Sequence, residues 1–132
     1  MNGIVLDTNV VSEPKRPRPD PDRLFLTTTV ICELAEGIER MLAGRRRRDF
    51  EGWLDGLVAE DFRERVLVLD VAAARLFGRL AASAYAQGRP PRMGDAQIAA
   101  VAVRDNNMAV ATRDVADFEP FGVLLVDPWA AD

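Results

Sequence analysis

Short runs of wholly apolar residues alternate along the chain with segments whose apolar positions are spaced for helices. The runs have the length of strands and lie at residues 4–6, 24–30, 66–70, 108–112 and 123–127, of which 24–30 is either a strand or the entry from a strand into a helix. Strands that are apolar throughout are typical of a parallel sheet covered on both faces. We therefore expect an α/β fold, a three-layer α/β/α sandwich with a central parallel sheet of four to five strands.

The segments between these runs have the apolar spacing of helices. They cover residues 30–48, 50–58, 72–87 and 93–106, with a short helix or turn at 114–121. The arginine run at 45–48 is expected to close the first helix, and Gly88 with the following prolines ends the third. The 93–106 segment is almost wholly apolar after Gln97, which predicts burial on most sides. Because no repeat or linker divides the 132 residues, we expect a single domain over residues 1–132.

The composition excludes several kinds of chemistry. Histidine is absent, which removes the usual acid or base at neutral pH and the commonest nitrogen ligand of zinc. The one cysteine, Cys32, lies in the apolar stretch TVICELA and is expected to be a buried, inert thiol. No apolar run reaches the length of a membrane span and the first residues do not resemble a signal peptide, so we expect a cytoplasmic protein without a membrane segment.

Four acidic residues stand where the predicted fold would gather them. Asp7 and Asp114 follow apolar strands, and Glu33 and Asp95 lie on helices whose first turns face the same edge of the sheet. Loops at the carboxyl ends of parallel strands converge, so all four carboxylates can meet there. Clustered carboxylates repel one another unless a cation lies between them, and oxygen ligands without histidine or cysteine suit Mg²⁺ or Mn²⁺. Such a site predicts metal-dependent hydrolysis of a phosphodiester.

Each of these acidic residues also has a structural interpretation. Asp7 opens an Asp-Thr-Asn turn, and Asp95 lies in a first helical turn, where aspartate satisfies free N–H groups. One of the pair Asp114 and Asp117 can likewise cap a helix. Glu33, at the margin of an apolar stripe, is by itself typical of a surface residue. The structural interpretations suit single residues, whereas the functional one rests on the whole set.

The acidic residues lie in motifs that resemble the PIN-domain ribonucleases, specifically the VapC and FitB-like toxins of bacterial type II toxin–antitoxin pairs. The motifs are LDTNVVSE, ELAEGIER, GDAQIAAVA, ATRDVADF and VDPW, in family order over nearly the whole chain. The resemblance implies that the four acidic residues are the catalytic, metal-binding positions. Thr112 matches a hydroxyl-bearing position near the site, and Asp117 and Asn9 are candidate supporting residues.

The resemblance also implies an activity and partners. It implies an endoribonuclease dependent on Mg²⁺ or Mn²⁺ that forms a homodimer and is inhibited by a cognate antitoxin. The antitoxin would place a basic tail in the acidic cleft and bind operator DNA through another portion, so that the toxin reaches that DNA only through its partner. The arginine run, which comprises Arg45, Arg46, Arg47 and Arg48, can contact RNA phosphates. Its alternative role is a solvated helix end where cations complement the dipole.

The connection between the first two strands departs from the family pattern. Family members usually carry an amphipathic helix before the second strand, whereas here PRPDPD leads directly into RLFL. Fourteen residues, Val10–Arg23, separate Asn9 from Leu24, which is close to the lower limit for a crossover between parallel strands. Either this loop crosses in extended form, which would leave one face of the sheet poorly covered, or a further segment belongs there.

Two other classes of protein fit parts of the sequence. An aspartyl-nucleophile phosphatase needs a second Asp two residues after the first, where this chain has Asn9. A response-regulator receiver needs a lysine at the end of a late strand, whereas the only lysine is Lys15. A non-catalytic PIN-like binding module would keep the fold without the chemistry, and four intact carboxylates argue against it. The sequence therefore favours a metal-dependent endoribonuclease.

Overall fold

Five parallel strands form one sheet at the centre of the fold. The computed structural model describes residues 3–12, 23–105 and 107–127. The strands are β1 (Ile4–Leu6), β2 (Leu24–Thr27), β3 (Val66–Leu67), β4 (Ala109–Ala111) and β5 (Leu125–Val126), in the order β3-β2-β1-β4-β5. Val5 and Leu6 of β1 are at most 1% exposed, as is typical of a central strand covered on both faces. The predicted α/β sandwich around a parallel sheet is confirmed.

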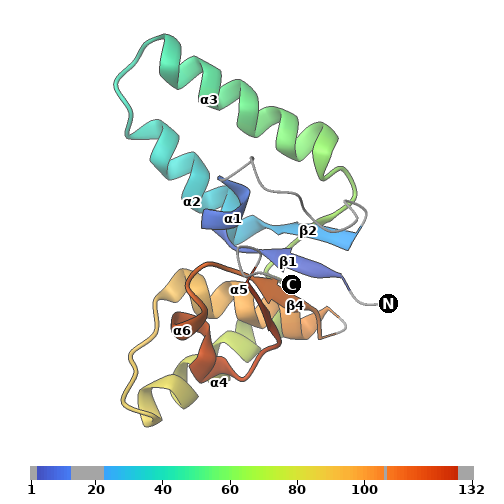
Figure 1. Cartoon of the computed structure of the whole chain (residues 1–132), viewed down its shortest axis with the longest axis vertical. Helices are drawn as coiled ribbons and strands as arrows, with labels where there is room; N and C mark the ends of the chain where they lie inside the picture. Colours follow the sequence, from blue (N-terminus) through green and yellow to red (C-terminus); the bar gives the residue numbers. More distant parts are fainter. Residues whose placement is uncertain (1–2, 13–22, 106, 128–132) are drawn as a thin grey trace.

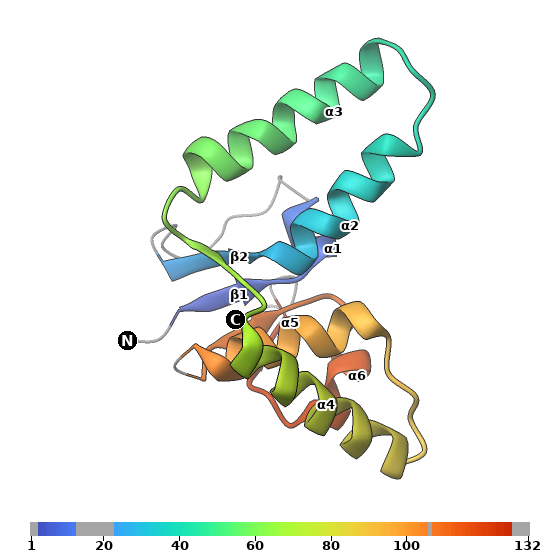
Figure 2. The same cartoon turned by 180° about the vertical axis from the view of Figure 1, so that it is seen from behind.

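Helices flank this sheet on both sides. They are α1 (Thr8–Val11), α2 (Thr28–Glu39), α3 (Arg45–Gly56), α4 (Val71–Ala86), α5 (Met93–Arg104) and α6 (Val115–Phe118). A π-helical turn (Leu57–Asp61) follows α3, and a 3₁₀ turn (Glu119–Phe121) follows α6. In two opposite views α2 and α3 form a pair on one side of β1 and β2, and α4, α5 and α6 gather on the other (Figures 1 and 2). Predicted helices at 72–87 and 93–106 correspond closely to α4 and α5.

The strand order reverses next to β1. From β1 the chain first adds β2 and β3 on one side, and later β4 and β5 on the other. In parallel α/β sheets ligands bind at such a reversal, beyond the carboxyl ends of the strands. Asp7 follows β1 and Thr112 follows β4, so both residues stand at this position. Helix α5 packs against β1, β4 and α4. Most of its residues from Ala96 to Ala102 are buried.

The arginine run begins a helix rather than closing one, which corrects the prediction. α2 ends at Glu39, residues 40–44 interrupt the helical path, and Arg45–Arg48 form the first turn of α3. Gly44 has a φ of 156°, which residues with a β-carbon rarely adopt, so the break between the two predicted helices lies before the arginine run and not after it. Cations at a helix N-terminus oppose the dipole, so the alternative role as a dipole-complementing helix end is wrong.

Cys32 lies on the outer face of α2, which also corrects a prediction. Its thiol is exposed, whereas Val30 and Ile38 of the same helix are buried. Position 32 is about 200° around the helix from Val30, so an apolar neighbourhood in sequence does not place it in the core. The expectation of a buried thiol is therefore wrong.

Some expectations are narrowed by the structure or lie outside it. The predicted strand 66–70 is regular only over Val66–Leu67, and the 24–30 segment is a strand to Thr27 that passes into α2. The proline-rich connection at 13–22 and the end of the VDPW motif lie outside the described residues. Within the described residues no helix is long and apolar enough to cross a bilayer.

Candidate active site

Asp7 is a buried carboxylate at the carboxyl end of β1, with 5% of its surface exposed. Its Oδ1 accepts a hydrogen bond from the backbone N–H of Thr8 and its Oδ2 accepts one from Thr112 Oγ1, both at 2.8 Å. Burial raises the pKa of Asp7, these two hydrogen bonds oppose the rise, and the charges of Glu33 and Asp114 add to it. Asp7 does cap α1, yet a cap has no need of such burial or of the second bond.

Thr112 links Asp7 to Asp114. The Thr112 hydroxyl donates to Asp7 and accepts from the backbone N–H of Asp114 at 2.9 Å. Asn9 Nδ2 donates to Asp114 Oδ2 at 2.9 Å, and Asn9 Oδ1 accepts from the backbone N–H of Arg113. Asp114 occupies the N-cap position of α6, but its side chain makes no capping hydrogen bond. Its carboxylate is therefore positioned by Asn9 and not by the helix that it precedes.

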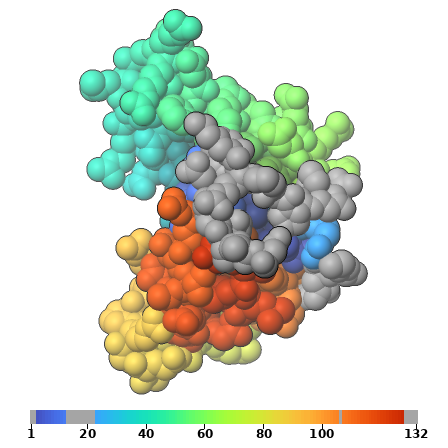
Figure 3. Space-filling view, in the orientation of Figure 1, coloured from blue at the N-terminus to red at the C-terminus, as the bar shows by residue number. Residues whose placement is uncertain are grey.

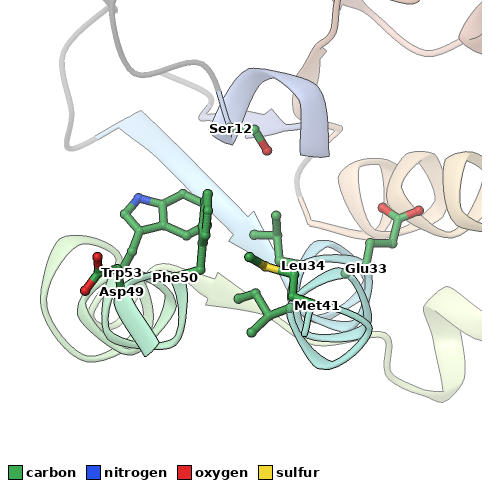
Figure 4. A pocket seen from close by; sticks show the side chains of 9 residues that line it. Ser12, Glu33, Leu34, Met41, Asp49, Phe50 and Trp53 are labelled. Atoms are coloured by element: carbon green, nitrogen blue, oxygen red, sulfur yellow. The ribbon is translucent and has the colours of Figure 1, made fainter. Parts of the chain in front are cut away.

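Glu33 reaches the site from α2. Its Oε1 accepts a hydrogen bond from Thr8 Oγ1 at 2.5 Å. Its other oxygen lies against Gly94 in the first turn of α5, where an added β-carbon would be 2.7 Å from Oε2. In Figure 4 the carboxylate points away from the side chains of Leu34, on the same helix, and Met41, just beyond the end of that helix. Glu33 thus bridges the start of α1 and the start of α5.

Asp95 lies half-buried in the first turn of α5. Burial raises its pKa to about 7, with further increases from the charges of Asp7 and Asp117, and the Arg92 guanidinium opposes the rise. Asp95 and Asp117 line a cavity of about 120 Å³ together with Arg89, Arg92 and three prolines. Carboxyl groups with such a raised pKa are concentrated at functional sites.

The four acidic residues thus converge from separate parts of the chain. Glu33 and Asp114 raise the pKa of Asp7, and Asp7 raises that of Asp95, so the carboxylates act on one another. Within the described residues, however, no three acidic side chains approach one point closely enough to enclose a metal ion. The donors are all oxygen atoms, which suits Mg²⁺ or Mn²⁺, and repelling carboxylates need a positive counter-charge at neutral pH. The chemistry of these residues therefore fits a divalent cation. Within the described residues, their side chains surround the space for the ion only in part.

Most residues proposed from the sequence lie together at this site. These are Asp7, Asn9, Glu33, Asp95, Thr112, Asp114 and Asp117. The arginine run does not join them, because α3 begins at the end of the α2–α3 pair away from α5 (Figure 1). Sequence reasoning missed Thr8, Arg92 and Gly94. The signal for Thr8 and Gly94 was their position directly beside an acidic residue, in DT and GD.

A mostly apolar groove lies between α2 and α3, beside the acidic site. Its volume is about 600 Å³, and it is lined by Ser12, Glu33, Leu34, Gly37, Ile38, Met41, Asp49, Phe50 and Trp53. Leu34 on α2 and Met41, two residues after its end, face Phe50 and Trp53 on α3 (Figure 4). The two aromatic rings meet edge to face with centroids 6.1 Å apart. The helices that form the groove are the cyan to green part of the surface in Figure 3. Glu33 borders both the groove and the acidic site.

Known proteins share this fold and its length. The PIN domain family model matches residues 4–119. The chain is 38% identical over 137 residues to the VapC ribonuclease Y4jK of Sinorhizobium fredii, with 96% of the chain and 97% of that protein covered. It is 28% identical to a chain in the structure of FitAB bound to an IR36 DNA fragment, with a TM-score of 0.85 and coverage of 98% and 97%. It is also 29% identical to a chain of VapBC-5, a toxin–antitoxin system of Mycobacterium tuberculosis, with a TM-score of 0.72 and 90% of each chain covered. This chain belongs to the PIN-domain family.

Proposed function

We propose that the chain is a metal-dependent endoribonuclease that acts as the toxin of a type II toxin–antitoxin pair. The observation that carries this proposal is the pairing of the buried Asp7 with the half-buried Asp95 at the carboxyl end of the central strand. Two such carboxylates repel each other at neutral pH, so a divalent cation stabilises their ionised forms. Membership of the PIN-domain family and the similarity to a VapC ribonuclease support RNA as the substrate.

In this proposal each side chain has a separate role. Asp7 and Asp95 would hold the ion directly, and Glu33 and Asp114 would complete its surroundings. A bound Mg²⁺ or Mn²⁺ would polarise the scissile phosphodiester and lower the pKa of a water molecule that attacks it. Thr112 fixes the orientation of the Asp7 carboxylate, and Asn9 holds Asp114. Because these contacts join the ends of two adjacent strands, the acidic residues are positioned before RNA arrives.

The position of Asn9 argues against an aspartyl-nucleophile phosphatase. Such an enzyme needs a carboxylate two residues after the nucleophile. Here that place is taken by an amide, and it donates to Asp114. An amide there supports a neighbouring carboxylate and cannot supply the acid or base of the phosphatase reaction.

Removal of the metal is the direct test of the proposal. Purified chain incubated with RNA and Mg²⁺ or Mn²⁺ is expected to cleave it, and EDTA is expected to abolish cleavage, as followed on denaturing gels. Ca²⁺ is the matched cation control, because it carries the same charge but prefers more ligands at longer distances and should support little activity. Cleavage that continues in EDTA would contradict the proposed mechanism.

The partner in this proposal is an antitoxin. FitAB and VapBC-5 support such a partner, and the DNA in the FitAB structure supports operator binding through the antitoxin. The groove between α2 and α3 is its proposed docking surface, since it is apolar and borders Glu33, where a basic tail can reach the acidic site. We further propose that the chain forms a homodimer and acts in the cytoplasm, where its RNA substrate is found.

Phe50→Glu is expected to separate antitoxin binding from catalysis. A charge buried in the apolar groove has no partner there, so affinity for the antitoxin should fall at least tenfold while RNA cleavage stays within about twofold of wild type. Phe50 is 38% exposed, so a glutamate there can turn its carboxylate to water and the helix should remain stable. The measurement is binding to the protein encoded by the neighbouring open reading frame, alongside the cleavage assay.

The matched control for Phe50→Glu is Val58→Glu. Val58 is also 38% exposed but does not line the groove. Equal losses of antitoxin affinity in both variants would show that the groove is not the docking surface.

The arginine run is proposed as a contact for RNA phosphates. Arg47 pairs with Glu39 at 2.8 Å and approaches Glu51 at 4.0 Å, and Arg46 lies over the ring of Phe50. The helix dipole does not stabilise cations in the first turn of α3, whereas the phosphates of a bound RNA would stabilise these arginines.

A further inference from the structure

The carboxylate of Glu33 occupies the space that a side chain at position 94 would take. A β-carbon built at Gly94 would lie 2.7 Å from Glu33 Oε2 and 3.3 Å from Glu33 Cδ. Both distances are shorter than ordinary van der Waals contact. Of the nine glycines in the chain, only Gly94 has carboxylate atoms within 4 Å of its absent side chain.

The backbone does not require glycine at this position. Gly94 is the second residue of α5, and it is absent from the residues with positive φ, which include Gly44, Gly88 and Gly122. Alanine is the better residue in a helix, because glycine loses more conformational freedom on folding. The glycine therefore weakens the helix slightly, and what it provides is the space beside it.

A second contact holds Glu33 in that space. Thr8 Oγ1 donates to Glu33 Oε1, while Oε2 faces Gly94, so the two oxygens are bounded by different elements. Thr8 directly follows Asp7, and Gly94 directly precedes Asp95. The carboxylate of Glu33 thus lies between Thr8 and Gly94, the neighbours in sequence of the two most buried acidic residues of the site.

From this arrangement we propose that Gly94 is a positioning residue, whose missing side chain lets α2 place the Glu33 carboxylate against the first turn of α5, where Thr8 holds it. This inference rests on the proposed metal-dependent function. It adds the residue that sets the position of the Glu33 carboxylate in that site. A methyl group at position 94 would meet the flexible end of Glu33 and not a backbone atom. The fold would accommodate it by turning Glu33 away, with loss of the bond to Thr8.

The test compares Gly94→Ala, Glu33→Asp, the double variant Gly94→Ala/Glu33→Asp and a matched control, Gly52→Ala. Gly52 is also helical, but its added β-carbon would meet nothing within 4 Å. Three quantities are measured: the midpoint of thermal unfolding, the affinity for Mn²⁺ by calorimetry, and the rate of RNA cleavage. Gly94→Ala and Gly52→Ala are both expected to unfold at or above the wild-type temperature.

Gly94→Ala, but not Gly52→Ala, is expected to lower Mn²⁺ affinity and cleavage at least tenfold. The double variant should lose less than the product of its two single losses, because the shorter aspartate no longer reaches the added methyl group. The inference would be overturned if Gly94→Ala bound Mn²⁺ and cleaved RNA as wild type does. It would also be overturned if the loss in the double variant equalled the product of the two single losses. Wild-type protein that binds Mn²⁺ but leaves RNA intact would remove the proposed function alone, and the Mn²⁺ affinities would still decide on Gly94. Wild-type protein that binds no Mn²⁺ would overturn both.

Discussion

Asp7→Asn is expected to lower the rate of RNA cleavage by about 10³-fold and to leave the chain folded. The amide has the shape of the carboxylate and can still accept the bond from Thr8, but it carries no charge to bind a divalent cation. Since burial raises the pKa of Asp7, a neutral side chain should unfold at the same or a higher temperature in the absence of metal. Initial rates of cleavage and thermal unfolding followed by circular dichroism measure the two effects.

Asp55→Asn provides the control for this prediction. It makes the same chemical change at an exposed position on α3, outside the acidic site, and should leave the cleavage rate unchanged. If Asp7→Asn unfolds the chain, the role of Asp7 is that of a helix cap. If it cleaves RNA at the wild-type rate, the catalytic assignment is wrong.

Stability of the metal-free chain is expected to fall as the pH rises from about 4 to above 7. The unfolded chain binds a proton at Asp95 only below about pH 4, whereas the folded chain keeps that proton up to about pH 7. Between these values the folded state binds more protons than the unfolded state, so the free energy of unfolding decreases with increasing pH. The contribution of Asp95 is fully present below pH 4 and is lost above pH 7. It amounts to a few kcal/mol at most, or several degrees in the unfolding temperature, because the group is partly solvated.

Thermal unfolding in EDTA between pH 5 and pH 8.5 measures this effect. Asp95→Asn is expected to flatten the profile and to unfold at a higher temperature than wild type at pH 8.5, but not at pH 5. Mn²⁺ should raise the unfolding temperature of wild type at pH 8.5 more than that of the variant, since at a given ion concentration the tighter-binding protein is stabilised more. Parallel pH profiles for the two proteins would be inconsistent with the environment described for Asp95.

The sheet and its acidic edge were predictable because both depend on local patterns. A wholly apolar run such as IVL suits a buried parallel strand, and a polar residue directly after it must lie at the strand's carboxyl end. Asp7 followed from that rule directly, and Asp114 followed from its place three residues after β4. The arginine run was misplaced because the break between the two helices was predicted after it, whereas the chain leaves the helical path at residues 40–44, before it.

The contacts that orient the acidic residues could not be derived in the same way. The bond from Thr112 to Asp7 joins residues 105 positions apart and depends on the register that pairs Leu6 with Ala111. The space beside Gly94 depends on how closely α2 approaches α5, which no periodicity encodes. The apolar groove could not be derived either, because it depends on α2 and α3 lying face to face, which the apolar spacing within each helix does not encode.

Glu33 stands on the border between the surface proposed for the antitoxin and the surface proposed for the substrate. In the proposed function, a mutation at this border that weakens antitoxin binding would also weaken cleavage. Changes on α3, such as Phe50→Glu, would instead weaken antitoxin binding and leave RNA cleavage intact. In this proposal, substitutions that weaken only antitoxin binding are therefore confined to the part of the groove away from Glu33, and a substitution of Glu33 itself would weaken both antitoxin binding and cleavage.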